Sequence, residues 1–348
     1  MKYKEQGKQG LFDNANAIEL MSEMGNSLER LSKVVNFEMF RALLEEELSP
    51  KEKKYRGGAR PYDYVMMFKI LILQRLFNLS DKQVQYQITD RLSFKSFLGL
   101  SSGDKVPDEK SVWAFRERLT QKGLIEVIFT QFHQYLIEQG LIINEGKMVD
   151  ASFAPVPRQR NSKEENEKIK KGEGDELWND KPHKKRHKDI DSRWTKKNNE
   201  TVHGYKNHAI ADTKSKLIDK YHVSDASVHD SQALEELLDE NMKEQELHAD
   251  GAYTGENQEE TIQKNGMINK VNEKGYRNRP LSEEQKKQNQ EKSRVRSRIE
   301  HIFGYIEQSM KGLKVRSIGI VRARGIIGLI NLTYNMMRYE QIMRLGMS

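Results

Sequence analysis

Three acidic residues of this 348-residue chain, Asp150, Asp250 and Glu300, have the types and surroundings needed for metal-dependent chemistry on phosphodiesters. Asp150 follows the apolar run KMV and Asp250 ends the run ELHAD, so both are expected at the ends of strands. Glu300 stands in RVRSRIEHIFG, whose apolar spacing predicts a helix. Carboxylate oxygens suit Mg²⁺, and phosphodiester cleavage and transfer use two such cations about 3.5 to 4 Å apart. Three carboxylates from separate elements can hold such a pair.

Each of these acids also has a simpler interpretation. Asp150 would cap a turn at a strand end, and Asp250 would begin an Asp-Gly turn with Gly251. Glu300 would form a helix ion pair with Arg296, four residues earlier, which stabilises a helix by about 0.2 to 0.5 kcal/mol. Ion pairing and metal binding by Glu300 do not exclude each other.

The composition indicates a basic protein that has no cysteine. Lys and Arg total 59 against 52 Asp and Glu, a net charge of +7, which suits a polyanionic partner. The absence of cysteine excludes disulfides, thiolate zinc sites and cysteine nucleophiles. No apolar run approaches the roughly 18 residues of a membrane span, and MKYKEQGKQG at the N-terminus lacks the apolar core of a signal peptide. We expect a soluble, cytosolic protein.

Residues 1–145 have the apolar spacing of helices, most clearly in YVMMFKILILQRLF and SVWAFRERL. Ser80 and Gln83 predict a capping box, and Asp108 predicts the start of the helix that carries Trp113 and Phe115. We therefore predict an all-helical domain over residues 1–145.

From residue 146 the pattern changes to short apolar runs typical of strands, separated by helical segments. The expected strands are KMVDASF, HAIAD, LIDKYHV, ELHADGAY and MINKV, of which the second and third form a hairpin. The expected helices are DSQALEELLDENMK, TGENQEETIQKNG and the run from Leu281 to about Met310. A basic charged insertion, residues 155–202, follows the first strand, and residues 311–348 are expected to form C-terminal helices.

This order of elements predicts an α+β protein, with a ribonuclease H-like catalytic domain over residues 146–348. Such a domain has a mixed sheet with helices on both faces. Acids at the ends of neighbouring strands converge there, and a helix packed beside them adds a third. Asp150, Asp250 and Glu300 occupy such positions.

At these residues the sequence resembles the DDE transposases of bacterial insertion sequences, in particular the fifth insertion-sequence family. The similar blocks are GGARPYDYVMMFKILILQRLFNLSDKQVQYQITDRLSFKSFLGL, PDEKSVWAFRERL, MVDASFAP, HGYKNHAIAD, ELHADGAYTG and RSRIEHIFG, in that order. The resemblance implies that Asp150, Asp250 and Glu300 are catalytic and bind two Mg²⁺ ions, with Mn²⁺ as a substitute. Asp150 would bridge both ions. Water would cut the end of the element, and the released 3′ hydroxyl would attack target DNA.

The resemblance also implies contacts to double-stranded DNA, namely terminal inverted repeats and target DNA, by a homodimer assembled on that DNA. Of the family's signature after the second Asp, Arg296 and Glu300 match, whereas Ser293 replaces Tyr and Glu307 replaces Lys. Lys311 lies about one turn after the replaced Lys. The expected DNA-binding residues are Arg296, Lys311, Lys184, Lys185, Arg186 and Lys206.

Two other features of the insertion have open interpretations. His183 and His187 are spaced as two metal ligands on one helix face, but the surrounding Lys and Arg oppose a divalent cation. Trp178 and Trp194 would either stack on an exposed base or pack within the protein.

The sequence therefore predicts a transposase that binds terminal inverted repeats and catalyses metal-dependent strand cleavage and strand transfer. One alternative is a DNA-binding protein without transposition, a captured copy that acts as a regulator. Another is a nuclease of the same fold that only hydrolyses DNA.

Overall fold

The computed structural model describes residues 10, 12–50, 60–197, 199–276 and 279–347. Contacts divide the chain into two compact units. The helical unit comprises Met1–Arg118 and Tyr339–Arg344, and the sheet unit comprises Leu119–Arg338 and Leu345–Ser348. The predicted boundary between functional domains, after residue 145, stays a prediction.

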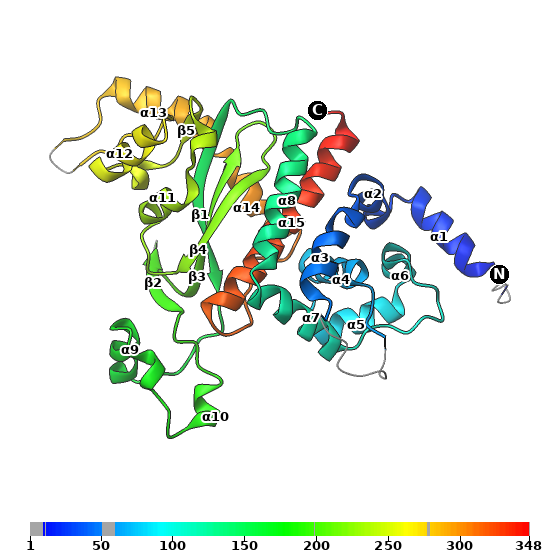
Figure 1. The fold of residues 1–348 in the computed structure, drawn as a ribbon. Helices are drawn as coiled ribbons and strands as arrows, with labels where there is room; N and C mark the ends of the chain where they lie inside the picture. The colour runs from blue at the N-terminus through cyan, green and yellow to red at the C-terminus, as the bar shows by residue number, and fades with distance from the viewer. Residues whose placement is uncertain (1–9, 11, 51–59, 198, 277–278, 348) are drawn as a thin grey trace, which may run out of the picture. The chain divides into compact units, whose positions relative to one another are not determined.

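The helical unit is built from short helices, as the apolar spacing predicts (Figure 1). In chain order these are α1 (Asp13–Glu23), α2 (Ser27–Val34), η1 (Phe37–Phe40), α3 (Arg41–Leu48), α4 (Tyr64–Leu76), α5 (Asp81–Asp90), α6 (Leu92–Leu98) and α7 (Glu109–Gln121), which runs on into the sheet unit.

Sequence features fix the helix ends and the core of the helical unit. Ser80 and Gln83 form the predicted capping box at α5, and the Asp108 carboxylate accepts the Ser111 N–H at the start of α7. Helix α4 is buried on most sides, including Phe68 and Leu71, so its apolar residues form the centre of the unit. In the described part of the chain, no helix has the length and apolar character that a membrane crossing requires.

The sheet unit contains six strands and the remaining helices. The strands are β1 (Gly146–Pro155), β2 (Arg193–Lys197), β3 (Glu200–Asp212), β4 (Ile218–Asp225), β5 (Glu246–His248) and β6 (Ile268–Asn269). The helices are α8 (Leu124–Glu138), α9 (Lys163–Lys170), η2 (Gly174–Glu176), α10 (Pro182–Lys185), η3 (Asp230–Ala233), α11 (Leu234–Leu237), η4 (Glu240–Met242), η5 (Gly251–Tyr253), α12 (Glu256–Lys264), α13 (Glu283–Arg296), α14 (Arg298–Gln308) and α15 (Ile320–Leu345).

The sheet is mixed, with the strand order β2-β3-β1-β5-β6 and with β4 also paired to β3. Strand β3 pairs antiparallel with β1, β2 and β4, whereas β5 is parallel to both β1 and β6. The α+β prediction and the predicted β3–β4 hairpin are therefore confirmed.

Helices cover both faces of this sheet (Figure 1). On one face Val149 and Ile210, which are paired in register, pack in an apolar cluster with Leu234 and Leu237 of α11 and Ile262 of α12. On the other face the sheet meets α8 and α15. There the Asn207 and Asn331 side chains bond to each other, and the rings of Phe129 and Tyr221 meet edge to face.

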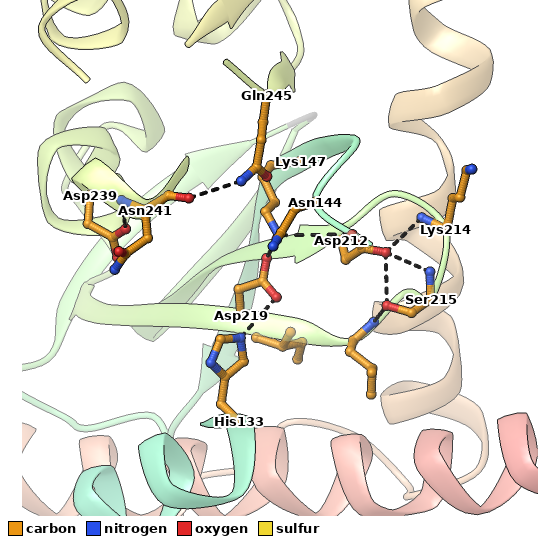
Figure 2. A network of polar contacts seen from close by, with 12 residues as sticks. His133, Asn144, Lys147, Asp212, Lys214, Ser215, Asp219, Asp239, Asn241 and Gln245 are labelled. Carbon is orange, nitrogen blue, oxygen red and sulfur yellow. Dashed lines mark hydrogen bonds and ion pairs between the residues drawn. The ribbon is translucent and has the colours of Figure 1, made fainter. Parts of the chain in front are cut away.

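A buried polar network ties β1 to the β3–β4 hairpin (Figure 2). The Lys147 ammonium lies 2.5 Å from the Asp219 carboxylate, and both side chains are buried. His133 Nε2 lies 3.1 Å from the other oxygen of Asp219. Asp212 accepts N–H groups in the hairpin turn, including that of Ser215 at 2.7 Å. Removal of one partner would leave a buried charge uncompensated. The network therefore favours this arrangement of the strands over one in which these charges are separated.

The structure differs from the sequence prediction at several element ends. Strand β1 continues five residues past Asp150, because pairing with β3 extends to Pro155, and β5 ends two residues before Asp250. The predicted single helix from Leu281 is broken at Ser297 into α13 and α14. The predicted amphipathic helix after β4 is a series of short turns, η3, α11 and η4. Strand β2, inside the insertion, was not predicted.

Candidate active site

Asp150 and Glu300 are joined through one guanidinium group. Arg296 Nη1 lies 3.3 Å from Asp150 Oδ2, and Arg296 Nη2 lies 2.7 Å from Glu300 Oε1. Arg296 ends α13 and Glu300 lies in the first turn of α14, so the break at Ser297 places both residues beside β1. The predicted Arg296–Glu300 ion pair is confirmed, and the same arginine also reaches the strand acid.

The two carboxylates differ in their freedom to move. Asp150 is held in a paired strand, its side chain is 17% exposed, and its Oδ1 accepts the Ala151 N–H. The Glu300 side chain is 57% exposed on a helix surface. Glu300 is therefore the more accessible of the two acids to a ligand from solvent.

Asp250 lies in the turn that follows β5. Its carboxylate caps η5 by accepting the Ala252 N–H at 2.8 Å, so the predicted Asp-Gly turn is present. One turn later the Tyr253 side chain is buried. Burial raises the pKa of the Tyr253 hydroxyl well above its usual value, and three carboxylates raise it further, those of Asp150, Asp230 and Asp250. The turn after β5 therefore carries both an acidic side chain and a buried hydroxyl.

The three predicted ligands are carboxylates, the side chains that hard divalent cations prefer. In the described ranges no three His, Cys, Asp or Glu side chains are close enough together to bind a metal ion. Two of the predicted ligands, Asp150 and Glu300, are instead paired with the positive charge of Arg296. Their carboxylate oxygens are of the kind that hard cations prefer. His183 and His187 are both exposed in the insertion, and no third ligand joins them among the residues described.

Comparison with known families decides what kind of protein carries this arrangement. A family model described as "Transposase DDE domain" matches residues 145–336, more than half of the chain. The chain belongs to the DDE transposases. A second model, "Transposase domain (DUF772)", matches residues 16–118, and the two together are typical of the fourth and fifth insertion-sequence families. No solved structure matches the chain.

Membership explains several features of the transposase at once. The DDE domain implies a ribonuclease H-like fold, in agreement with the observed mixed sheet and C-terminal helices. DDE transposases use divalent metal ions, and DNA is their substrate. The predicted family is therefore confirmed.

The predicted DNA-binding residues of the insertion differ in their availability. Lys184 is ion-paired with Glu165 at 2.6 Å, and Lys185 Nζ donates to the Asn179 side chain at 2.7 Å. The side chain of Arg186 is exposed. Arg186 is thus the member of this group that solvent, or a phosphate, reaches most directly.

Lys206 has a different environment from the one predicted. It is buried, and its ammonium donates to the carbonyl of Val228 and to Asp230 Oδ1 at 2.8 Å. To meet a DNA phosphate this ammonium would have to leave Asp230, and DNA contact by Lys206 stays a prediction. Lys311 is exposed after α14.

The two tryptophans of the insertion are largely engaged in packing. Trp178 is 7% exposed, donates its Nε1–H to Glu165, and lies under the Lys184 ammonium. Trp194 is partly exposed and stacks on His203, with ring centroids 4.6 Å apart. Of the two, only Trp194 has a face within reach of solvent.

Sequence reasoning missed the Arg296–Asp150 contact, Tyr253 and the Lys206–Asp230 pair. The Arg296–Asp150 contact joins residues 146 positions apart, and the Lys206–Asp230 pair joins residues 24 positions apart. Local spacing therefore contains no signal for either contact. Tyr253 is different, because it lies in the block ELHADGAYTG, in which only Asp250 is a predicted site residue.

Proposed function

We propose that this DDE transposase binds the terminal inverted repeats of an insertion sequence, cuts the DNA at the element's ends and joins the released 3′ ends to target DNA. The observation that supports this most directly is the bridge from Asp150 through Arg296 to Glu300 in a chain of this family. It brings together acids from a strand and a helix that have no local reason to meet.

Asp150, Asp250 and Glu300 are the proposed ligands of two Mg²⁺ ions, for which Mn²⁺ substitutes. When bound, such a pair activates the attacking oxygen and stabilises the leaving oxygen. Asp150 on β1, Asp250 in the turn after β5 and Glu300 on α14 would hold these ions.

Arg296 has two successive roles in this proposal. In the structure it balances the charge of Asp150 and Glu300. Once cations take over that charge, the guanidinium is available to a DNA phosphate, which it contacts through paired N–H donors.

A water molecule attacks the scissile phosphorus and the 3′ oxygen leaves. The resulting 3′ hydroxyl then attacks a phosphorus of target DNA and displaces the 3′ oxygen of the target strand, so no covalent protein intermediate forms.

Other parts of the chain would hold the DNA in place. We assign recognition of the inverted repeats to residues 1–145, and phosphate contacts to the exposed Arg186 and Lys311 and to the neighbouring Lys184 and Lys185. Two element ends must be processed together, and we therefore propose a homodimer on DNA.

The test is a cleavage and joining assay with the DNA that flanks this gene as the element end. With Mg²⁺, the wild-type protein should produce cut ends and then joined products. Asp150→Asn and Asp250→Asn should each reduce cleavage at least about a thousandfold while DNA binding, measured by gel shift, stays within about threefold. Products that are cut but never joined would indicate a hydrolytic nuclease. Specific binding without any cleavage would indicate a regulator, and either result would overturn the proposal.

A further inference from the structure

Tyr253 is a buried tyrosine whose hydroxyl lacks a bonding partner. The residue is 1% exposed, and among the residues that the structure describes its Oη has no hydrogen-bond partner. Buried polar groups in proteins are nearly always hydrogen-bonded, because burial without a partner costs free energy. Such a hydroxyl therefore calls for a functional explanation.

The ring of Tyr253 is held firmly. It belongs to the apolar cluster that contains Val149 and Ile210. Val149 precedes Asp150 in β1, and Ile210 is paired with Val149 across the strands. The backbone N–H of Tyr253 donates to the Asp250 carbonyl at 3.1 Å, and the Asp250 side chain caps the same turn. The position of the hydroxyl is thus set by the two elements that carry Asp150 and Asp250.

The surroundings of the hydroxyl are acidic. The carboxylates of Asp150, Asp230 and Asp250 all act on it, and Asp150 has the largest effect of the three. Asp230 is already bonded to the Lys206 ammonium at 2.8 Å, and Asp250 caps η5. Asp150 is held on one side by Arg296, at 3.3 Å, a long distance for a hydrogen bond to a charged group. Asp150, whose Oδ1 also accepts the Ala151 N–H, is the acid that would exchange Arg296 for cations, and the Tyr253 hydroxyl is a donor that can take over the place of Arg296.

We propose that Tyr253 is a positioning residue of the carboxylate site, whose hydroxyl donates a hydrogen bond to Asp150 when Arg296 no longer holds that carboxylate. The inference rests on the proposed function, since it concerns the cation-bound form of the same site. The hydroxyl fixes the orientation of Asp150 toward the cations and so increases the affinity of the site for them. Removing an outer partner of a metal ligand typically lowers metal affinity by roughly ten- to a hundredfold.

The test compares Tyr253→Phe with a matched control, Tyr334→Phe, in the full-length protein. Tyr334 is also buried, but its hydroxyl donates to the Lys216 carbonyl, away from the carboxylates. Mn²⁺ affinity is measured by calorimetry, and cleavage of element-end DNA is measured over a range of Mn²⁺ concentrations. Tyr253→Phe should weaken Mn²⁺ binding and raise the Mn²⁺ concentration for half-maximal cleavage by roughly tenfold. Saturating Mn²⁺ should restore most of the rate, and Tyr334→Phe should leave both Mn²⁺ values unchanged.

Thermal unfolding without metal separates positioning from a purely structural role. Because the hydroxyl lacks a partner in the metal-free protein, Tyr253→Phe should unfold at or slightly above the wild-type Tm. A lower Tm would show that the hydroxyl has a structural partner and would overturn the assignment. Wild-type Mn²⁺ affinity in Tyr253→Phe would overturn it as well. Asp150→Asn in the same assay separates the two proposals. If Asp150→Asn abolishes cleavage, a failed prediction for Tyr253→Phe concerns Tyr253 alone. Full activity in Asp150→Asn would refute the proposed function itself.

Discussion

Arg296 shows how a single cationic side chain can stabilise two carboxylates in the absence of a metal ion. Two carboxylates that approach each other raise each other's pKa and repel. The guanidinium between Asp150 and Glu300 removes that repulsion with one hydrogen bond to each. In the metal-bound site that we propose, cations would replace Arg296 as the positive partner of both acids.

Two acids on α14, Glu300 and Glu307, are rivals for the role of third ligand. They lie seven residues apart, which returns Glu307 to nearly the same helix face but about 10 Å further along the axis. Glu300 bonds to Arg296, whereas the Glu307 carboxylate lies over the turn at Gly312. We expect Glu300→Gln to abolish Mg²⁺-dependent cleavage and Glu307→Gln to retain most of it, in the same end-cleavage assay. Loss of cleavage only with Glu307→Gln would make Glu300 a simple helix ion pair.

The sequence predicts parts of this site to different degrees. The Arg296–Glu300 pair follows from a spacing of four residues and is confirmed. The assignment of Asp150, Asp250 and Glu300 as ligands stays a prediction. The Arg296–Asp150 contact depends on how α13 packs against β1 and β5, and such packing is set by the whole fold and not by spacing along the chain.

At the scale of elements, β1 and β3 are the pair on which Asp150 depends, and Gly204 of β3 lies close against the backbone of β1. Gly204 lies opposite Pro155 and has a φ of +153°. A Cβ there would overlap the Ala154 carbonyl oxygen, which belongs to the backbone and cannot move aside as a side chain would. Only glycine fits this position without a shift of one strand.

Gly204→Ala should therefore destabilise the protein by about 2 to 3 kcal/mol, the cost of overpacking a rigid site. Chemical denaturation followed by circular dichroism would measure the change. Gly304→Ala in α14 is the matched control, because a Cβ at Gly304 meets no atom within 4 Å and alanine favours a helix by roughly 0.5 to 1 kcal/mol. Equal stability of the two variants would contradict the close approach of the strands.

Elements with strong periodicity were predicted well, and those set by long-range contacts were not. The β3–β4 hairpin and α12 follow from local patterns and are confirmed. The break at Ser297 has no glycine or proline to announce it. Strand β2 is polar and exists through its pairing with the first residues of β3, so local hydrophobicity could not reveal it.

For the whole molecule, the net charge of +7 makes binding to DNA dependent on salt. Each phosphate neutralised contributes about −0.9 to the slope of log affinity against log salt. We expect a slope of roughly −4 to −7 for nonspecific duplex DNA, as five to eight phosphate contacts would give. Arg186→Gln should make the slope less negative by about 0.9. Fluorescence anisotropy titrations at several KCl concentrations would measure both, and a slope near zero would exclude a surface that follows the phosphate backbone.

Helix α15 has a consequence for the order in which the transposase is completed during its synthesis. Tyr339–Arg344 of this helix belong to the helical unit, where Glu340 is buried and lies 2.8 Å from Arg30. Ribosomes add about 5 to 20 residues per second, so the roughly 220 residues between Arg118 and Tyr339 take about 10 to 45 s. Through that interval the nascent helical unit lacks the partner of Arg30. A chain that stops within the sheet unit therefore lacks Glu340, and its helical unit lacks this buried ion pair.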